Sequence, residues 1–162
     1  MDTHRSFCPV NLLVEIVGDK WTFLVLRDII FYKRRHFNEL LRLSEEGIAS
    51  NILRDRLAML EKEGMVTKAK DPEDAHKQKI KYSLTEKCID LLPMLFEAII
   101  WSIKHAPVDQ AKYKPAIDLV EGGPEVFARF RASLMNDHAL QDPVTPQPQS
   151  ERGEEHHPAP GR

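Results

Sequence analysis

The sequence has 162 residues, of which 42% are hydrophobic and 30% charged, enough to form one domain of ordinary size with appendages. Its formal net charge of −2 gives no overall basic signal for non-specific binding to nucleic acid. No apolar run approaches the roughly 20 residues that span a bilayer, no secretory leader is evident, and two cysteines make no disulfide framework. We therefore expect a cytoplasmic protein without membrane association.

The charge is distributed unevenly along the chain. Residues 1–105 contain 17 basic and 16 acidic side chains, whereas residues 106–162 contain 6 and 9. We expect a domain over residues 1–105 and a helical extension over residues 106–140. Residues 141–162 are rich in Pro, Gln, Glu and His, a composition that cannot form a core and predicts disorder.

The first third of the chain predicts three helices. A proline at a first-turn position favours a helix over residues 9–17. Residues 21–31 are apolar almost all round, which is typical of the buried central helix of a small bundle. A short basic connector follows, and residues 37–43 predict a third, shorter helix.

The most informative segment is the amphipathic helix predicted for residues 50–63. Ser50 can cap its first turn, and Gly64 suits its end because glycine tolerates the left-handed conformation. Its apolar positions at helical spacing are Ile52, Leu53, Leu57 and Leu60. The opposite side exposes Ser50, Asn51 and Arg54, whose side chains can hydrogen-bond base edges.

A hairpin and a long helix are predicted next. Residues 65–69 and 79–84 have strand patterns and flank an acidic turn cluster at residues 71–74. Residues 85–103 predict one long helix, and residues 124–135 another. The order of these elements up to residue 105, including a short strand after the second helix, is that of a winged helix-turn-helix. The fold class is therefore mainly α with a small β-hairpin wing.

Motifs spread over about residues 8–105 are similar to those of a known family. They are C-P-V at 8–10, G-D-K-W-T at 18–22, L-R-D at 26–28, R-H-F-N-E-L at 35–40, G-I-A-S-N-I-L at 47–53, R-L at 56–57, L-E-K-E-G at 60–64, Y-S-L-T-E at 82–86, L-L-P at 91–93, and Trp101. In this order the chain resembles the HxlR-type bacterial transcriptional regulators. The resemblance implies a winged-helix homodimer, joined by the first and last helices of the domain, on a pseudo-palindromic operator of double-stranded DNA. The chain departs from the family at Ala49, where many members have a serine that can cap the helix. If Ser50 caps the helix instead, its hydroxyl is occupied and is less available for a base contact.

The resemblance assigns roles to polar residues. We expect Ser50, Asn51 and Arg54 to contact bases in the major groove. Backbone phosphates are expected to contact Arg35, His36 and Asn38 at a helix N-terminus, and His76, Lys77 and Lys79 in the second half of the wing loop. The alternative for each group is a solvated surface. We interpret Arg56 as structural, paired with Glu39 or Glu61. Trp21 and Trp101 are interpreted as packing residues, and the dimer interface is an alternative place for Trp101.

Cys8 has two interpretations. It precedes Pro9 at a predicted helix start, where the helix dipole favours a thiolate, and some members of the resembled family sense oxidants or quinones at this position. The other interpretation is an inert residue in a packed helix. Cys88 is interpreted as core or interface.

No catalytic, metal-binding or cofactor-binding pattern is evident, so we expect neither an enzyme nor a cofactor. The leading hypothesis is a sequence-specific, homodimeric repressor of a nearby promoter, responsive to an oxidant at Cys8 or to a small molecule. The alternative is a winged-helix protein-interaction module without DNA binding. Such a module has no need for Arg54, Lys77 and Lys79 at base-reading and phosphate-reading positions.

Overall fold

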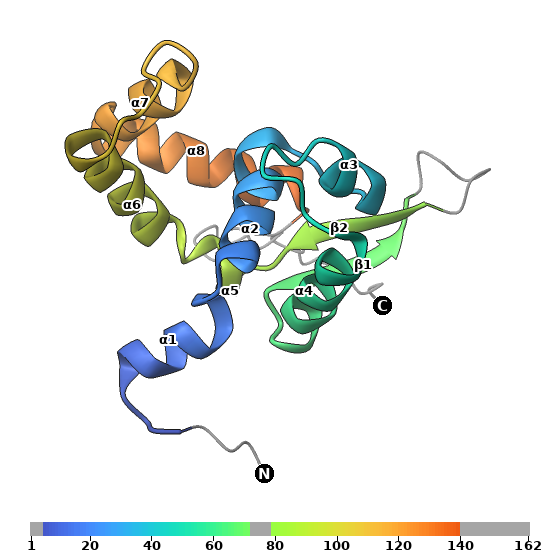
Figure 1. The fold of residues 1–162 in the computed structure, drawn as a ribbon. Helices are drawn as coiled ribbons and strands as arrows, with labels where there is room; N and C mark the ends of the chain where they lie inside the picture. The colour runs from blue at the N-terminus through green and yellow to red at the C-terminus, as the bar shows by residue number, and fades with distance from the viewer. Residues whose placement is uncertain (1–4, 72–78, 140–162) are drawn as a thin grey trace, which may run out of the picture.

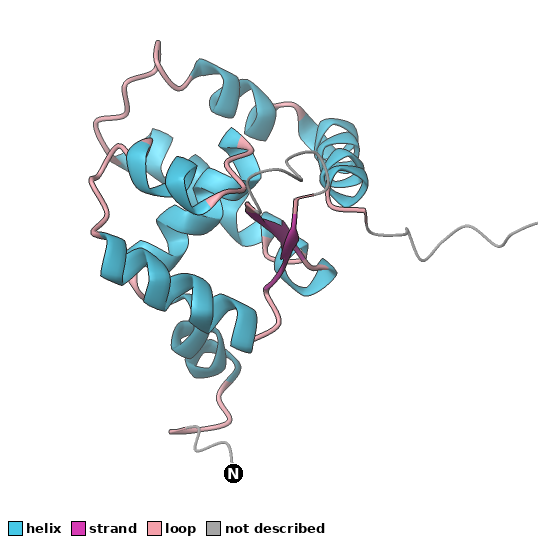
Figure 2. Cartoon of the chain, turned by 90° about the vertical axis from the view of Figure 1, so that its right-hand side faces the viewer, coloured by secondary structure: helices cyan, strands magenta, loops and turns pink. Residues whose placement is uncertain are grey.

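A computed structural model describes residues 5–71 and 79–139 of the chain. Its helices and strands follow one another along the ribbon in Figure 1: α1 (Pro9–Val17), α2 (Lys20–Tyr32), α3 (Phe37–Arg42), α4 (Ser50–Lys62), β1 (Val66–Lys70), β2 (Ile80–Leu84), α5 (Glu86–Ile89), α6 (Leu92–His105), α7 (Lys114–Glu121) and α8 (Gly123–Asp137). The described part is mainly helical with one two-stranded antiparallel hairpin (Figure 2). The predicted fold class, a helical domain with a small hairpin wing, is confirmed.

Helix α2 is the centre of the core, as its apolar composition predicts. Leu26, Ile29 and Ile30 are almost completely buried, and α2 packs against α1, α3 and α4. Its N-cap is Asp19, whose carboxylate accepts hydrogen bonds from the backbone N–H groups of Trp21 (3.0 Å) and Thr22 (3.1 Å). An aspartate at this position satisfies N–H groups that have no partner within the helix.

The wing consists of β1 and β2, paired from Val66 opposite Leu84 to Lys70 opposite Ile80. The backbone on the outer side of β2 is also paired: His36 forms a bridge with Lys81, and the Tyr82 N–H donates to the Arg35 carbonyl at 2.8 Å. The short strand predicted after the second helix is thus a single bridge. It fixes the start of α3 against the wing.

Two boundaries differ from the prediction. The N-cap of α4 is Ala49, not Ser50, and no side chain caps the helix. The predicted long helix over residues 85–103 is divided into α5 and α6 around Asp90 and Leu91. Pro93 lies in the first turn of α6, where its missing N–H needs no partner. In the middle of a continuous helix the same proline would remove one hydrogen bond and clash with the preceding turn.

The C-terminal helices α7 and α8 pack against α6 and contribute to the same core. Helix α8 covers residues 124–135 as predicted, whereas α7 was not expected. Four aromatic rings from α2, α6 and α8 form one cluster: the Phe31 and Phe130 centroids are 5.7 Å apart, and Phe96 lies edge-on to Phe127 at 5.0 Å. Leu134 and Met135 at the end of α8 are buried in the core.

Helix α1 projects away from the rest of the molecule (Figure 1). Phe7 before it and Val10 on it are 84% and 68% exposed. On α6, Trp101 is 62% exposed, so it does not pack inside a single subunit and its packing at a dimer interface stays a prediction, while Trp21 is half-buried. Within residues 5–71 and 79–139, no helix is long and apolar enough to cross a membrane.

Candidate nucleic-acid interface

The start of α4 presents an exposed polar surface. Ser50, Asn51 and Arg54 are all exposed on its first turns, and their side chains form no hydrogen bond or ion pair with any described residue. Because Ala49 occupies the N-cap, the Ser50 hydroxyl is not used for capping. All three side chains therefore keep their hydrogen-bonding capacity for a partner outside the subunit.

The opposite side of α4 is held firmly. Leu53, Leu57 and Leu60 are 0–2% exposed, as their helical spacing predicts. Gly64 has a φ of +67°, and the following Met65 N–H donates to the Leu60 carbonyl at 2.8 Å. This is the helix end expected for a glycine in the left-handed region.

A polar link also joins α4 to the N-cap of α2. Arg56 Nη1 lies 3.2 Å from Asp19 Oδ2. Arg56 is structural, as predicted, but its partner is Asp19 rather than Glu39 or Glu61. Burial opposes ionisation of Asp19, yet hydrogen bonds from Thr22 and the charge of Arg56 outweigh it and lower the pKa of this carboxyl. The link fixes the orientation of α4 on α2.

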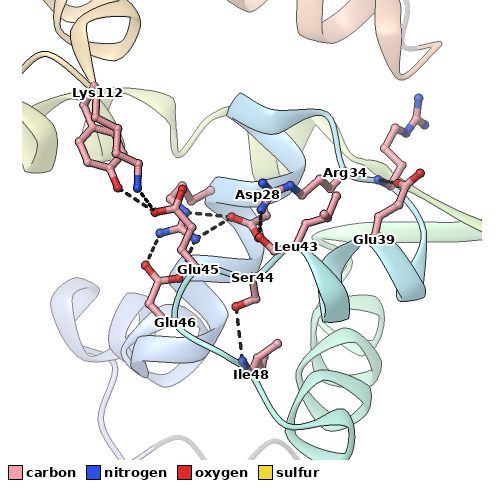
Figure 3. Close-up of polar contacts among 12 residues, drawn as sticks. Asp28, Arg34, Glu39, Leu43, Ser44, Glu45, Glu46, Ile48 and Lys112 are labelled. Atoms are coloured by element: carbon pink, nitrogen blue, oxygen red, sulfur yellow. Dashed lines mark hydrogen bonds and ion pairs between the residues drawn. The ribbon is translucent and has the colours of Figure 1, made fainter.

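The turn before α4 is held by its own acidic residues (Figure 3). Glu46 forms two hydrogen bonds with Arg27 of α2, at 2.6 and 2.9 Å. Glu45 Oε2 accepts hydrogen bonds from Lys112 Nζ (2.8 Å) and the Tyr113 hydroxyl (2.9 Å), both in the loop before α7. The turn that sets the position of α4 therefore contacts α2 on one side and the C-terminal extension on the other.

Beneath this turn lies a buried charge cluster around Asp28, which is 3% exposed. Arg27 Nη2 and Arg34 Nη1 donate to its two oxygens at 2.7 and 3.0 Å, and Arg34 also donates to the Leu43 carbonyl at 2.7 Å (Figure 3). Burial works against the charged form of Arg27, but Glu46 and Asp28 outweigh it and raise the pKa of its guanidinium. The cluster joins α2 to both ends of α3.

Arg35 does not project toward solvent as the sequence suggests. Its Nε donates to the Tyr82 carbonyl at 2.9 Å, its Nη1 to the Asp137 carbonyl at 2.7 Å, and its Nη2 to the Ser83 hydroxyl. The guanidinium thus joins β2 to the end of α8. This geometry favours a structural role over the phosphate contact expected from the sequence, because the donors face the protein itself.

His36 is committed in a similar way. Its Nε2 lies 2.7 Å from the buried Asp71 carboxylate, and its Nδ1 is 3.2 Å from Glu39. Burial of Glu39 opposes ionisation, but hydrogen bonds from the Arg35 and His36 backbone and from the His36 ring lower its pKa. Asn38, by contrast, is exposed on the first turn of α3.

Only part of the predicted wing contacts can be located. His76 and Lys77 lie outside the described residues. Lys79 is exposed, and its carbonyl accepts the Asp71 N–H at 2.8 Å at the base of the loop. Lys70, which the sequence did not single out, is exposed on β1 opposite Ile80 and next to this loop. Lys70 was not predicted as a contact because it directly precedes the acidic cluster at residues 71–74 in the sequence.

The two cysteines differ in environment. Cys8 is exposed and occupies the N-cap position of α1. Cys88 is buried, and this burial raises its pKa to about 12, so its thiol stays protonated near neutral pH. Among the described residues, no group of three or more His, Cys, Asp or Glu side chains is placed to hold a metal ion.

Comparison with known proteins gives a consistent result. The profile of the family described as HxlR-like helix-turn-helix matches residues 16–110. The HTH-type transcriptional regulator YdeP of Bacillus subtilis is 32% identical over 117 residues, which cover 70% of this chain and 80% of YdeP. The regulator Rv3095 of Mycobacterium tuberculosis is 33% identical over 98 residues, 60% of this chain and 59% of Rv3095.

Solved structures show the same fold. The redox regulator HypR in its reduced form matches with a TM-score of 0.52 and 26% identity, covering 60% of this chain and 92% of HypR. A candidate MarR-family transcriptional regulator from Porphyromonas gingivalis W83 matches with a TM-score of 0.51 and 29% identity, covering 62% of this chain and 94% of the other. These two matches cover about three fifths of this chain, and the family profile ends at residue 110.

Proposed function

Because the chain belongs to the HxlR-like helix-turn-helix family of transcriptional regulators, we propose that it is a homodimeric repressor that binds a pseudo-palindromic operator. The observation that carries this proposal is the start of α4, where Ser50, Asn51 and Arg54 are exposed and their side chains form no hydrogen bond or ion pair with described residues. Arginine pairs with guanine and asparagine with adenine in the major groove. In this arrangement α4 is the recognition helix.

The dimer is built from α1 and the outer face of α6. Phe7, Val10 and Val14 at α1 and Ile100 and Trp101 on α6 are exposed large apolar residues, between 40% and 84% accessible. Exposed apolar side chains in such numbers are typical of a surface that a partner covers. Two copies joined here would place two α4 helices on half-sites one helical turn apart, or a multiple of it.

Backbone contacts surround the recognition helix. In this proposal Asn38 at the start of α3 and Lys79 beside the wing contact phosphates, together with His76 and Lys77 of the wing loop. Lys70 joins them because it is exposed on the adjacent strand. Arg35 and His36 act indirectly, by holding β2 against α3 so that the wing keeps its angle to α4.

Selection of binding sites from random duplex DNA with the purified full chain tests the proposal. Enrichment of a pseudo-palindrome with half-sites about one turn apart is the expected result. If no sequence is enriched and the protein shows no salt-dependent affinity for DNA, the protein-interaction alternative replaces the proposal. Sedimentation at micromolar concentration tests the dimer, because an 18.7 kDa species alone would contradict it.

The same proposal makes Cys8 an oxidant-responsive residue. It is exposed at the N-cap of the helix assigned to the dimer interface. HypR, one of the structural matches, is named a redox regulator. We expect a mild oxidant to weaken operator binding by the wild type but not by Cys8→Ser. Equal loss in both proteins would place the response elsewhere, and Cys88 is a poor candidate because it is buried and protonated.

A further inference from the structure

A cavity of about 800 Å³ lies between α2, α6 and the C-terminal extension. Apolar side chains form most of its wall: Phe23, Leu24, Phe31, Ile99, Ile103 and Ile117. The loop over residues 107–113 and the start of α7 form its outer side. A volume of this size and a mainly apolar wall are typical of small-molecule sites.

The polar edge of the cavity indicates what kind of molecule fits. Its two basic residues are already neutralised, Arg27 by Asp28 and Glu46, and Lys112 by Glu45. The Tyr32 hydroxyl forms no hydrogen bond with any described residue, and Ser102 Oγ uses its proton on the Ala98 carbonyl, leaving its lone pairs available. Asp109, the acidic residue of the wall, accepts the backbone N–H of Lys112 at 3.0 Å and forms no ion pair with a described residue. The edge therefore offers hydrogen-bonding groups and one carboxylate to a ligand, but no uncompensated positive charge that would attract an anion.

The cavity is separate from the surface assigned to the dimer. On α6, Ala98, Ile99 and Ser102 line the cavity, whereas Ile100 and Trp101 are exposed. At 100° per residue these two sets lie on opposite sides of the helix. A second copy that covers Trp101 therefore approaches α6 from the side away from the cavity.

We propose that this cavity binds an uncharged aromatic small molecule with a hydroxyl or carbonyl group, and that binding is transmitted to the recognition helix through Glu45 and Glu46. Lys112 and Tyr113 belong to the cavity wall and both hydrogen-bond to Glu45, while Arg27, also in the wall, holds Glu46. A ligand that displaces the loop or Arg27 must alter the turn before α4. The consequence for DNA rests on the proposed function, but binding and transmission do not.

Calorimetric titration of the full chain with 2-naphthol, and with 2-naphthoate as its charged counterpart, tests the site. We expect saturable binding of 2-naphthol, weaker for 2-naphthoate by roughly tenfold because the carboxylate loses its water without gaining a counter-charge. Two variants fill the cavity from opposite walls, Ala116→Trp on α7 and Ala98→Phe on α6, and each should abolish binding. Ala132→Trp, on the exposed side of α8 and outside the cavity, is the matched control and should bind like the wild type.

The outcomes separate this inference from its alternatives. Absent saturable binding, or equal binding by the filled and control variants, overturns the site, and tighter binding of 2-naphthoate overturns its assigned chemistry. If the filled variants become monomeric while the control stays dimeric, a second copy occupies the cavity instead. The melting temperature of each variant shows that a loss of binding is not a loss of fold.

Amide hydrogen exchange tests the transmission without DNA. We expect 2-naphthol to change exchange in residues 44–54 of the wild type by several-fold, and we expect a smaller change in Glu45→Ala at a 2-naphthol concentration that saturates this variant, because Glu45 joins the cavity wall to the turn. An unchanged response in Glu45→Ala overturns the assigned route. Failure of the protein to select an operator would contradict the proposed function alone.

Discussion

Two helix starts in this molecule carry the polar residues that the sequence assigns to DNA, and they differ in one respect. At the start of α4, Asn51 and Arg54 are exposed, and their side chains form no hydrogen bond or ion pair with a described residue. At the start of α3, Arg35 and His36 are bound by β2, α8 and Asp71. When a guanidinium or imidazole forms hydrogen bonds within its own subunit, fewer of its N–H donors are available to bind a phosphate. In the proposed function, the start of α4 is therefore the binding surface, and the start of α3 is a structural joint.

Replacing the central residue of the joint should have the largest effect. Arg35→Ala removes the hydrogen bonds to Tyr82, Ser83 and Asp137 and takes this donor from the Tyr82 and Asp137 carbonyls. We expect the free energy of unfolding to fall by about 3 kcal/mol, since hydrogen bonds from a charged group contribute more than neutral ones. Denaturant titration measures this change.

Arg42→Ala is the matched control for Arg35→Ala. Arg42 is exposed at the last position of α3 and forms no hydrogen bond or ion pair with the described residues. Its substitution should change the free energy of unfolding by less than about 0.5 kcal/mol. If Arg35→Ala unfolds like the wild type but loses affinity for DNA at every sequence, Arg35 is a phosphate contact and the distinction between the two helix starts fails.

The opposite result is expected at α4. Arg54→Ala should leave the free energy of unfolding unchanged, because the side chain is exposed. It should lower operator affinity by about 2 kcal/mol, or roughly 30-fold, and relax the preference at one base position. Lys62→Ala near the exposed end of the same helix is the control. Fluorescence anisotropy on the selected operator and on a variant at each position gives both quantities, and an unchanged base preference would rule out the assigned contact.

The sequence predicts elements better than it predicts contacts between them. Spacing alone identified α4, its buried stripe and its end at Gly64, because these depend on residues within a few turns of each other. The partners of Arg35 are Tyr82, Ser83 and Asp137, 47 to 102 positions away. A basic residue at a helix start looks the same in sequence whether its partner is a phosphate or a distant carbonyl.

The C-terminal extension shows the same limit. The amphipathic helix α8 was predicted, but the contacts of the extension with other parts of the chain were not. The end of α8 contacts the wing through Arg35, and the loop before α7 contacts the turn before α4. Lys112 and Tyr113 reach Glu45 across more than 65 positions. Helix α7 was missed because proline and glycine breaks on both sides of a short segment favour loop. Packing against α6 compensates for its short length.

The stability of the contact between the wing and α8, next to Arg35, should also depend on pH. His138 is buried, and its Nδ1 accepts the Leu84 N–H at 2.9 Å. Burial and the nearby positive charge of Arg35 lower its pKa to about 4. This pKa is below the value in the unfolded chain, about 6.5. The contribution of His138 to the free energy of unfolding is therefore fully present above pH 6.5 and is lost as the pH falls toward 4. We expect a loss of roughly 1 to 2 kcal/mol, after allowance for solvent screening.

His138→Asn isolates this contribution, because the amide oxygen can accept the same hydrogen bond but does not titrate in this range. The difference in unfolding free energy between the wild type and the variant should change between pH 6.5 and 4 and be flat above pH 7. Parallel curves over the whole range would show that His138 does not titrate with the assigned pKa. Carboxylates that titrate in both proteins cancel in the difference.

The smallest effect is expected at the wing. Lys79 tests whether the wing contacts DNA, as proposed for α4, or has only a structural role, as Arg35 and His36 do. Lys79 is exposed, and its backbone fixes the base of the loop through the Asp71 N–H, so a side-chain substitution leaves that bond intact. Lys79→Ala should weaken binding to all DNA sequences alike and lower the slope of log affinity against log salt by about one unit, as expected for one lost phosphate contact. Lys114→Ala, on the distant α7 and paired with Asp118, should leave that slope unchanged. A sequence-dependent loss in Lys79→Ala would instead make the wing a base-reading element, and an unchanged slope would remove Lys79 from the proposed phosphate contacts.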